Sequence, residues 1–122
     1  MAAKGAHVRQ AEHNETFYSQ LLTTEFLDWA VTAIFYSALH YVDGYLATKN
    51  INPKFAHPPT HEVRTPLVGR ESNLRHIWPQ YRRLKDKSEA ARYRIKHFTQ
   101  GEVEGLKENE FEVIKSHILR HL

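Results

Sequence analysis

The stretch that most constrains the fold is residues 28–47, DWAVTAIFYSALHYVDGYLA, which is the longest mostly apolar run in the chain and contains one glycine and no proline. Its apolar residues cover several faces of a helix, which is the pattern of a helix buried on most sides. Polar residues and one tyrosine recur along it at spacings of three and four: Asp28, Thr32, Tyr36, His40 and Asp43. We therefore expect a central helix over about residues 25–48, with a partly polar strip on one face.

Further helices are expected on both sides of this run. Apolar residues at helical spacing predict them over residues 8–22, 61–68, 71–93 and 103–120. No segment alternates with period two for long enough to be a strand. The predicted fold is all-α: an up-and-down bundle of four to five helices, with the central helix packed against residues 71–93. We expect a single domain over residues 1–122, with residues 1–7 disordered.

Single residues predict where these helices begin and end. Thr24 is a good N-cap for the central helix. Pro66 is expected to end or kink the short helix over residues 61–68, because proline has no backbone N–H. Pro79 should either kink the following helix or stand in the first turn of a new one. Residues 50–60, NINPKFAHPPT, contain three prolines and are expected to form a loop.

Composition excludes several classes of protein. The chain has no cysteine, which excludes disulfides, thiolate metal sites and cysteine nucleophiles. No apolar run reaches the ~18 uninterrupted residues that a membrane span needs. The N-terminal segment lacks the apolar core of a secretory signal. We expect a cytoplasmic protein with no membrane partner.

The positive charge is concentrated in one part of the chain. The net charge is +3 with neutral histidines, and residues 64–96 are rich in arginine and lysine. Such a segment forms either solvated helix faces or a surface for a polyanion such as RNA. The charge alone does not choose between these two interpretations.

Histidine spacing predicts no metal site and no cofactor. His57 and His61 are separated by two prolines, so they cannot share a helical face. His117 and His121 lie one turn apart, but two histidines are fewer than the three or four ligands that zinc takes from a protein. The chain also has no phosphate-binding glycine loop and no nucleophile motif.

Two pairs of residues could line a polar seam inside the bundle. Tyr36 and His40 lie one turn apart on the central helix, and Ser88 and Arg92 lie one turn apart on the helix over residues 71–93. Arg92 should find a carboxylate partner, with Asp28 and Asp43 as candidates, or should contact a phosphate. The seam then either fixes the packing of the two helices or binds a ligand.

Three segments together resemble the HEPN superfamily of small helical domains. They are DWAVTAIFYSALHYVDGYLA (28–47), HEVR (61–64) and LRHIWPQYRRLKDKSEAARY (74–93), and the resemblance is to an uncharacterised prokaryotic branch. It implies an up-and-down bundle of four or five helices, often as a homodimer. Some members of this superfamily are metal-independent ribonucleases of toxin–antitoxin pairs, and others are noncatalytic and bind nucleotides or partner proteins.

In catalytic members an arginine is followed, after four to six residues, by a histidine. The resemblance therefore makes Arg92 and His97 the candidate catalytic pair, in which histidine acts as acid or base and arginine stabilises charge on phosphate. Arg70 and His76 satisfy the same spacing, so spacing alone does not select a pair. Tyr93, which follows Arg92, also departs from the small polar residue of the family pattern.

The sequence thus leaves three functions open. The first expectation is a noncatalytic HEPN-type module that binds a nucleotide, RNA or a partner protein. The alternatives are the ribonuclease and a structural subunit of a larger complex. The expected ligand-binding residues are Tyr36, His40, His61, Arg64, Ser88 and Arg92. The expected partners are a second copy of the chain and, through the resemblance, an antitoxin or a nucleotidyltransferase.

Overall fold

The computed structural model describes residues 4–49 and 61–122, and every regular element in those ranges is helical. The helices are α1 (Lys4–Leu21), α2 (Leu27–Ala47), α3 (His61–Arg70), α4 (Trp78–Tyr93), α5 (Gln100–Leu106) and α6 (Glu112–His121). A 3₁₀ turn, Arg75–Ile77, precedes α4, and a π-helical segment, Lys107–Phe111, joins α5 to α6 without a break.

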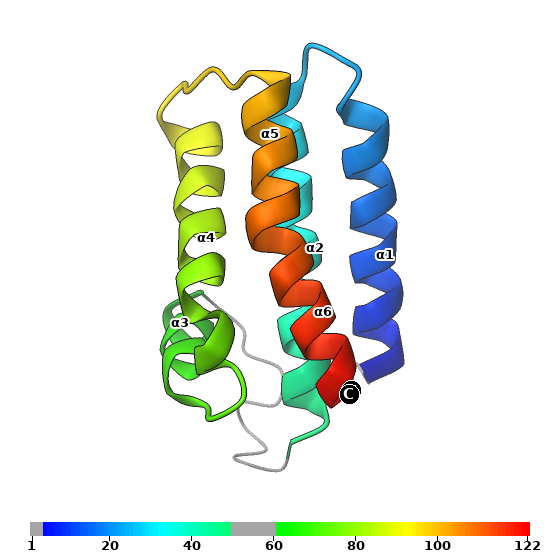
Figure 1. The fold of residues 1–122 in the computed structure, drawn as a ribbon, viewed down its shortest axis with the longest axis vertical. Coiled ribbons are helices and arrows are strands. Elements are labelled where there is room, and N and C mark those ends of the chain that lie inside the picture. Colours follow the sequence, from blue (N-terminus) through cyan, green and yellow to red (C-terminus); the bar gives the residue numbers. More distant parts are fainter. Residues whose placement is uncertain (1–3, 50–60) are drawn as a thin grey trace.

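The long helices run alternately up and down beside one another, with α3 packed at the end of the bundle where α4 begins (Figure 1). The predicted all-α, up-and-down bundle is therefore confirmed. The loop predicted at residues 50–60 lies outside the described residues. No helix in the described ranges is long and apolar enough to cross a membrane.

Helix α2 is the centre of the bundle, because it has neighbours on several sides. Its Ser37 hydroxyl donates to the Ala11 carbonyl of α1 at 2.7 Å. Toward α4, the ring centre of Phe35 lies 5.8 Å from that of Tyr81. Toward the π segment, Tyr41 lies 6.2 Å from Phe111. Nearly every side chain from residue 30 to residue 46 is buried, as the apolar run predicted.

The first helix begins earlier than the sequence indicated. Residues 4–7 are helical and His7 is only 3% exposed, so the prediction of disorder over residues 1–7 was wrong for these positions. The reason is tertiary packing, which the local sequence does not show. Gly44 of α2 faces His7 at this contact: a Cβ added at position 44 would lie 3.4 Å from the Cβ of His7, an ordinary van der Waals distance, so α1 and α2 are closely packed here.

Pro66 and Thr24 do not act as predicted. Helix α3 runs through Pro66, so the predicted end of the helix at that residue is wrong. The Pro66 nitrogen has no hydrogen to donate, and the buried side chains of Arg64 and Val68 hold the helix in place. Thr24 does not cap α2. Its hydroxyl instead donates to the Leu21 carbonyl at 2.6 Å and closes the turn after α1.

Two other helix starts follow the sequence closely. Pro79 stands in the first turn of α4, which is one of the two predicted alternatives. Thr99 caps α5 in a capping box: its hydroxyl accepts from the Glu102 N–H at 3.1 Å, and the Glu102 carboxylate accepts from the Thr99 N–H at 3.1 Å.

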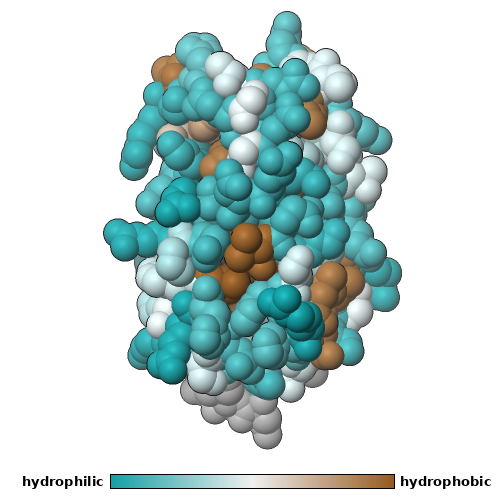
Figure 2. Space-filling model, in the orientation of Figure 1, coloured by the Kyte–Doolittle hydropathy of each residue, from teal (hydrophilic) through white to brown (hydrophobic). Residues whose placement is uncertain are grey.

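The surface is mainly hydrophilic, with separate hydrophobic patches on the face that Figure 2 shows. Several large apolar side chains are exposed near the end of the bundle where α2 begins and α4 ends: Phe26, Trp29, Tyr93 and Ile95. Glu25, Leu27 and Asp28 share a hollow with residues 95–98, which places these two helix ends side by side.

Candidate functional site

Four polar side chains from three helices meet between α2, α3 and α4, and we call them the Tyr36 cluster: Tyr36, His61, Ser88 and Arg92. The guanidinium carbon of Arg92 lies 5.3 Å from the centre of the Tyr36 ring. The ring of His61 lies 6.2 Å from that of Tyr36, centre to centre. Ser88 is one turn before Arg92 on α4 and is fully buried. The cluster thus joins both sides of the predicted seam and adds α3 to it.

The polar atoms of this cluster are buried without protein partners. Among the described residues, the Arg92 Nε and Nη1, the Ser88 hydroxyl and the His61 Nδ1 have no hydrogen-bond partner. Leaving such a group unsatisfied costs about 1–3 kcal/mol each, and more for a charged group. Native proteins keep few such atoms, so three residues of this kind in one place indicate a site for a polar ligand or for bound water.

The electrostatics of the cluster are set by cations. Burial lowers the pKa of His61 below its usual value, and the positive charges of Arg64, Lys85 and Arg92 lower it further. The lowered pKa favours the neutral ring of His61 at pH 7, in which one ring nitrogen can accept a hydrogen bond and the other can donate one. The site combines a cation with a neutral imidazole, which suits an anionic ligand that also carries a donor.

This shifted pKa gives a pH dependence of stability. In the unfolded chain His61 titrates near ~6.5, so below that pH the unfolded state binds more protons than the folded state. The contribution of His61 to stability is present above pH ~6.5 and is lost as the pH falls toward the lowered folded pKa. Urea unfolding at pH 7.5 and pH 5.5 should show a smaller loss of stability in His61→Asn than in the wild type. His13→Asn, at an exposed position, is the control and should behave as the wild type does; an equal loss in all three proteins would contradict the assignment.

Arg64 is held by an ion pair. Its Nε and Nη2 donate to the two carboxylate oxygens of Asp43 at 2.7 and 2.9 Å, and both side chains are buried. Asp43 was a predicted partner of Arg92, and that prediction was wrong. Arg92 lies level with Tyr36, and Asp43 is seven residues further along α2, or about 10 Å at 1.5 Å per residue.

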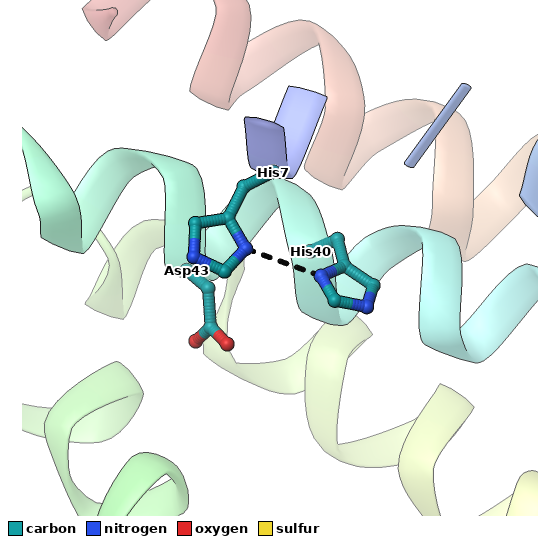
Figure 3. A group of neighbouring side chains, drawn as sticks. All are labelled: His7, His40 and Asp43. Carbon is teal, nitrogen blue, oxygen red and sulfur yellow. Dashed lines mark hydrogen bonds between the residues drawn. The ribbon is translucent and has the colours of Figure 1, made fainter. Parts of the chain in front are cut away.

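His40 faces α1 and not α4. Its Nδ1 lies 3.2 Å from the Nδ1 of His7, and the two rings are stacked with centres 5.5 Å apart. Figure 3 shows this pair with Asp43 on the same stretch of α2. The structure therefore separates His40 from the Tyr36 cluster, although the sequence placed both on one strip.

The turn after α4 carries His97. Helix α4 ends at Tyr93, and Ile95 has a φ of 50°, a left-handed conformation that is strained for a β-branched residue. His97 is exposed and lines an open hollow of about 730 Å³. The other charged residues that line it are Arg83, Asp86, Lys87, Arg94 and Lys96. Arg92 is turned toward Tyr36, so the structure does not bring Arg92 and His97 into contact within the described residues.

Sequence reasoning missed three parts of this region. The Tyr81 hydroxyl is buried without a partner in the part of the chain that the structure describes, and burial raises the pKa of this phenol. The Asp43–Arg64 pair links two residues that were named separately. His7 belonged to a segment that was expected to be disordered. The spacing between Asp43 and His40 was visible in the sequence, but nothing in it indicated that α1 would reach them.

The fold and the polar cluster define the class of this protein as a small all-α domain, an up-and-down bundle with polar side chains between its central helix and two later helices. A family model described as HEPN domain matches residues 5–118. The chain therefore belongs to the HEPN domain family, as the resemblance of the three segments implied, and this is a family of nucleotide- and RNA-related modules. The chain matches no curated protein and no solved structure.

Proposed function

We propose that this chain is a noncatalytic HEPN-type binding module whose ligand is single-stranded RNA, bound through phosphate at the C-terminal end of α4. The observation that carries the proposal is the state of Arg92. Two of its buried guanidinium nitrogens have no partner in the described ranges, although arginine in a folded protein ordinarily pairs with a carboxylate or a carbonyl. A phosphate oxygen pair matches the planar fork of guanidinium donors.

The surroundings of Arg92 support phosphate binding. Its guanidinium carbon lies 5.3 Å from the centre of the Tyr36 ring and 5.2 Å from that of Tyr93, within the range of cation–π contact with each ring. His61 and Ser88 supply neutral polar atoms beside it. Lys85 lies close enough to affect the pKa of His61, so a second cation is near.

The features beyond Arg92 favour RNA over a mononucleotide. The hollow that includes His97 adds four cationic residues next to the end of α4, which suits further phosphates along a strand. Tyr93 is 76% exposed and presents a ring on which a base can stack. The strained backbone at Ile95 lies in the turn between Tyr93 and the hollow that includes His97, and backbone strain of this kind is common at functional sites.

The separation of Arg92 from His97 supports the noncatalytic choice. In-line attack on phosphate needs the acid or base and the charge-stabilising group at one phosphate, and these two side chains are turned to different parts of the surface. The ribonuclease remains the second candidate, because His97 is exposed inside a basic hollow where RNA would lie.

The exposed apolar residues at the same end of the bundle support self-association. Phe26, Trp29 and Ile95 are exposed there, and we propose them as the contact between two copies of the chain. Two copies would then place two Arg92 clusters near one interface. An antitoxin or a nucleotidyltransferase is the proposed alternative partner for this surface, and light scattering of the purified chain distinguishes a dimer from a monomer.

The test is binding of a fluorescein-labelled oligouridylate, measured by anisotropy, with ATP as a competing mononucleotide. Arg92→Ala should weaken RNA binding about tenfold or more, since a good charge-assisted contact is worth about 1.5–3 kcal/mol. It should also reduce the salt dependence of binding by about one phosphate contact. ATP should compete weakly, because it engages only part of the surface.

Arg120→Ala is the matched control. Arg120 is exposed at the end of α6, at the opposite end of the bundle, so this variant removes the same charge from a distant place. Its RNA affinity should be close to that of the wild type. Equal losses of affinity in both variants would show that binding depends only on net charge, and would contradict a site at Arg92. Cleavage of the RNA in chelator, lost in His97→Ala, would favour the ribonuclease instead.

A further inference from the structure

We propose that His7, His40 and Asp43 form a binding site for a divalent transition-metal ion of the zinc class. The site is independent of the RNA proposal. It lies at the N-terminal end of α1, with His40 one turn along α2 from Tyr36 and Asp43 three residues beyond it (Figure 3).

The two imidazoles already have the spacing of zinc ligands. Their Nδ1 atoms are 3.2 Å apart. For a tetrahedral ion with zinc–nitrogen bonds of about 2.0–2.1 Å, two ligand nitrogens lie about 3.3 Å apart. A metal ion bound to both Nδ1 atoms would lie to one side of the line that joins them, which requires rotation of the two rings. The proton that now joins the two nitrogens moves to the Nε2 of the donating ring, so both imidazoles coordinate as neutral rings with no net release of protons.

A carboxylate supplies the third ligand. One oxygen of Asp43 and one nitrogen from each histidine all lie within 4.8 Å of one another. A tetrahedral edge is about 3.3 Å, so the ligand atoms have to approach one another by up to about 1.5 Å, which requires movement of the two histidine side chains toward the carboxylate. Two histidines and one carboxylate form a set that suits zinc among the available divalent ions.

The fold holds these three residues for reasons that are visible in the packing. His40 and Asp43 are three apart on α2 and share a face. Gly44, next to Asp43, faces His7, so the packing of α1 on α2 places His7 across from them. His7 and Asp43 are buried and His40 is half-buried. The site is therefore enclosed by protein on most sides and reaches the surface at His40, where a water molecule can complete the coordination.

Arg64 contacts the proposed site through Asp43 and would not bind the metal itself. Its two hydrogen bonds hold the Asp43 carboxylate in place. Each carboxylate oxygen has two lone pairs, so an oxygen that accepts from Arg64 can still coordinate a metal. Hydrogen bonds of this kind commonly orient a metal-binding carboxylate. The positive charge of Arg64 opposes a second cation, so we expect micromolar affinity.

The experiment uses the whole chain, stripped of metal with a chelator, and zinc alone as the probe. Competition against a chromophoric zinc indicator at pH 7.5 should show one zinc ion per chain. Cobalt(II) in place of zinc should give the strong visible absorption of a four-coordinate site. Affinity should fall steeply below pH ~6.5, where the histidines take up protons.

Two variants locate the site. His40→Gln should weaken zinc binding about tenfold or more, and circular dichroism without metal shows whether it is folded. The control is His76→Ala combined with His121→Ala, because these exposed rings lie 5.6 and 4.6 Å from that of His117 and form the competing group of histidines on the surface. The control should bind zinc as the wild type does. Loss of zinc in the control but not in His40→Gln, or no four-coordinate cobalt spectrum in the wild type, would overturn the proposal.

Discussion

Replacing Arg64 with alanine is expected to lower the free energy of unfolding by about 3–5 kcal/mol, because it leaves the Asp43 carboxylate buried without its cation. Both side chains of this pair are almost inaccessible, and Arg64 donates two hydrogen bonds to Asp43. Typical domains have only about 5–15 kcal/mol in total, so a large part of the stability would be lost. Urea denaturation followed by circular dichroism measures this directly.

Arg83→Ala is the control for that measurement. Arg83 also pairs with a buried carboxylate, Glu110, at 2.8 Å, but its own side chain is 56% exposed. We expect a smaller loss, of about 1 kcal/mol, since an ion pair with an exposed, solvated arginine contributes little to stability. The double variant Arg64→Ala with Asp43→Ala should be less destabilised than the sum of the two single changes. Additive losses would show that the pair contributes little as a pair.

The Arg64–Asp43 pair also shows why sequence reasoning stopped short of the site. Spacing on one helix placed Asp43 on a polar strip, and spacing on another placed Arg92 at the edge of the core. Which cation reaches which carboxylate depends on how far each helix slides along its neighbour. That offset is set by side chains that pack between helices, so the residue pattern within one helix does not predict it. Asp43 is paired with a cation, but that cation is Arg64 of α3 and not Arg92 of α4.

The fold was more predictable than the site because its signals are local. The apolar run of α2, the capping box at Thr99 and the position of Pro79 each act within a few residues. The failures were also instructive. His7 is ordered and Pro66 is tolerated because contacts from other helices outweigh the local preference. Tertiary packing therefore overrides the local sequence preference at His7, in the proposed metal site, and at Pro66, in the helix that carries His61 and Arg64.

Replacing Phe35 with alanine is expected to destabilise the fold by about 3–5 kcal/mol, the usual loss for a fully buried phenylalanine. Phe35 is 0% exposed and its ring centre lies 5.2 Å from Tyr36, 5.8 Å from His61 and 5.8 Å from Tyr81. The residue therefore supports the rings that surround Arg92. Its removal should reduce RNA affinity as well as stability, at temperatures where the variant remains folded.

Trp29→Ala is the control for Phe35→Ala. It shows whether the loss of stability and affinity is specific to Phe35 or follows from the loss of any large aromatic side chain on α2. Trp29 is on the same helix and is larger than Phe35, but it is 54% exposed. Its truncation should change the free energy of unfolding by about 1 kcal/mol or less. If the Tyr36 cluster is the binding site, Phe35→Ala lowers both stability and affinity, because the loss of packing beneath Tyr36 and His61 also removes the placement of Arg92. If the Phe35→Ala protein is destabilised but binds RNA with unchanged affinity, the Tyr36 cluster is not the RNA-binding site. The hollow around His97 would then be the remaining candidate.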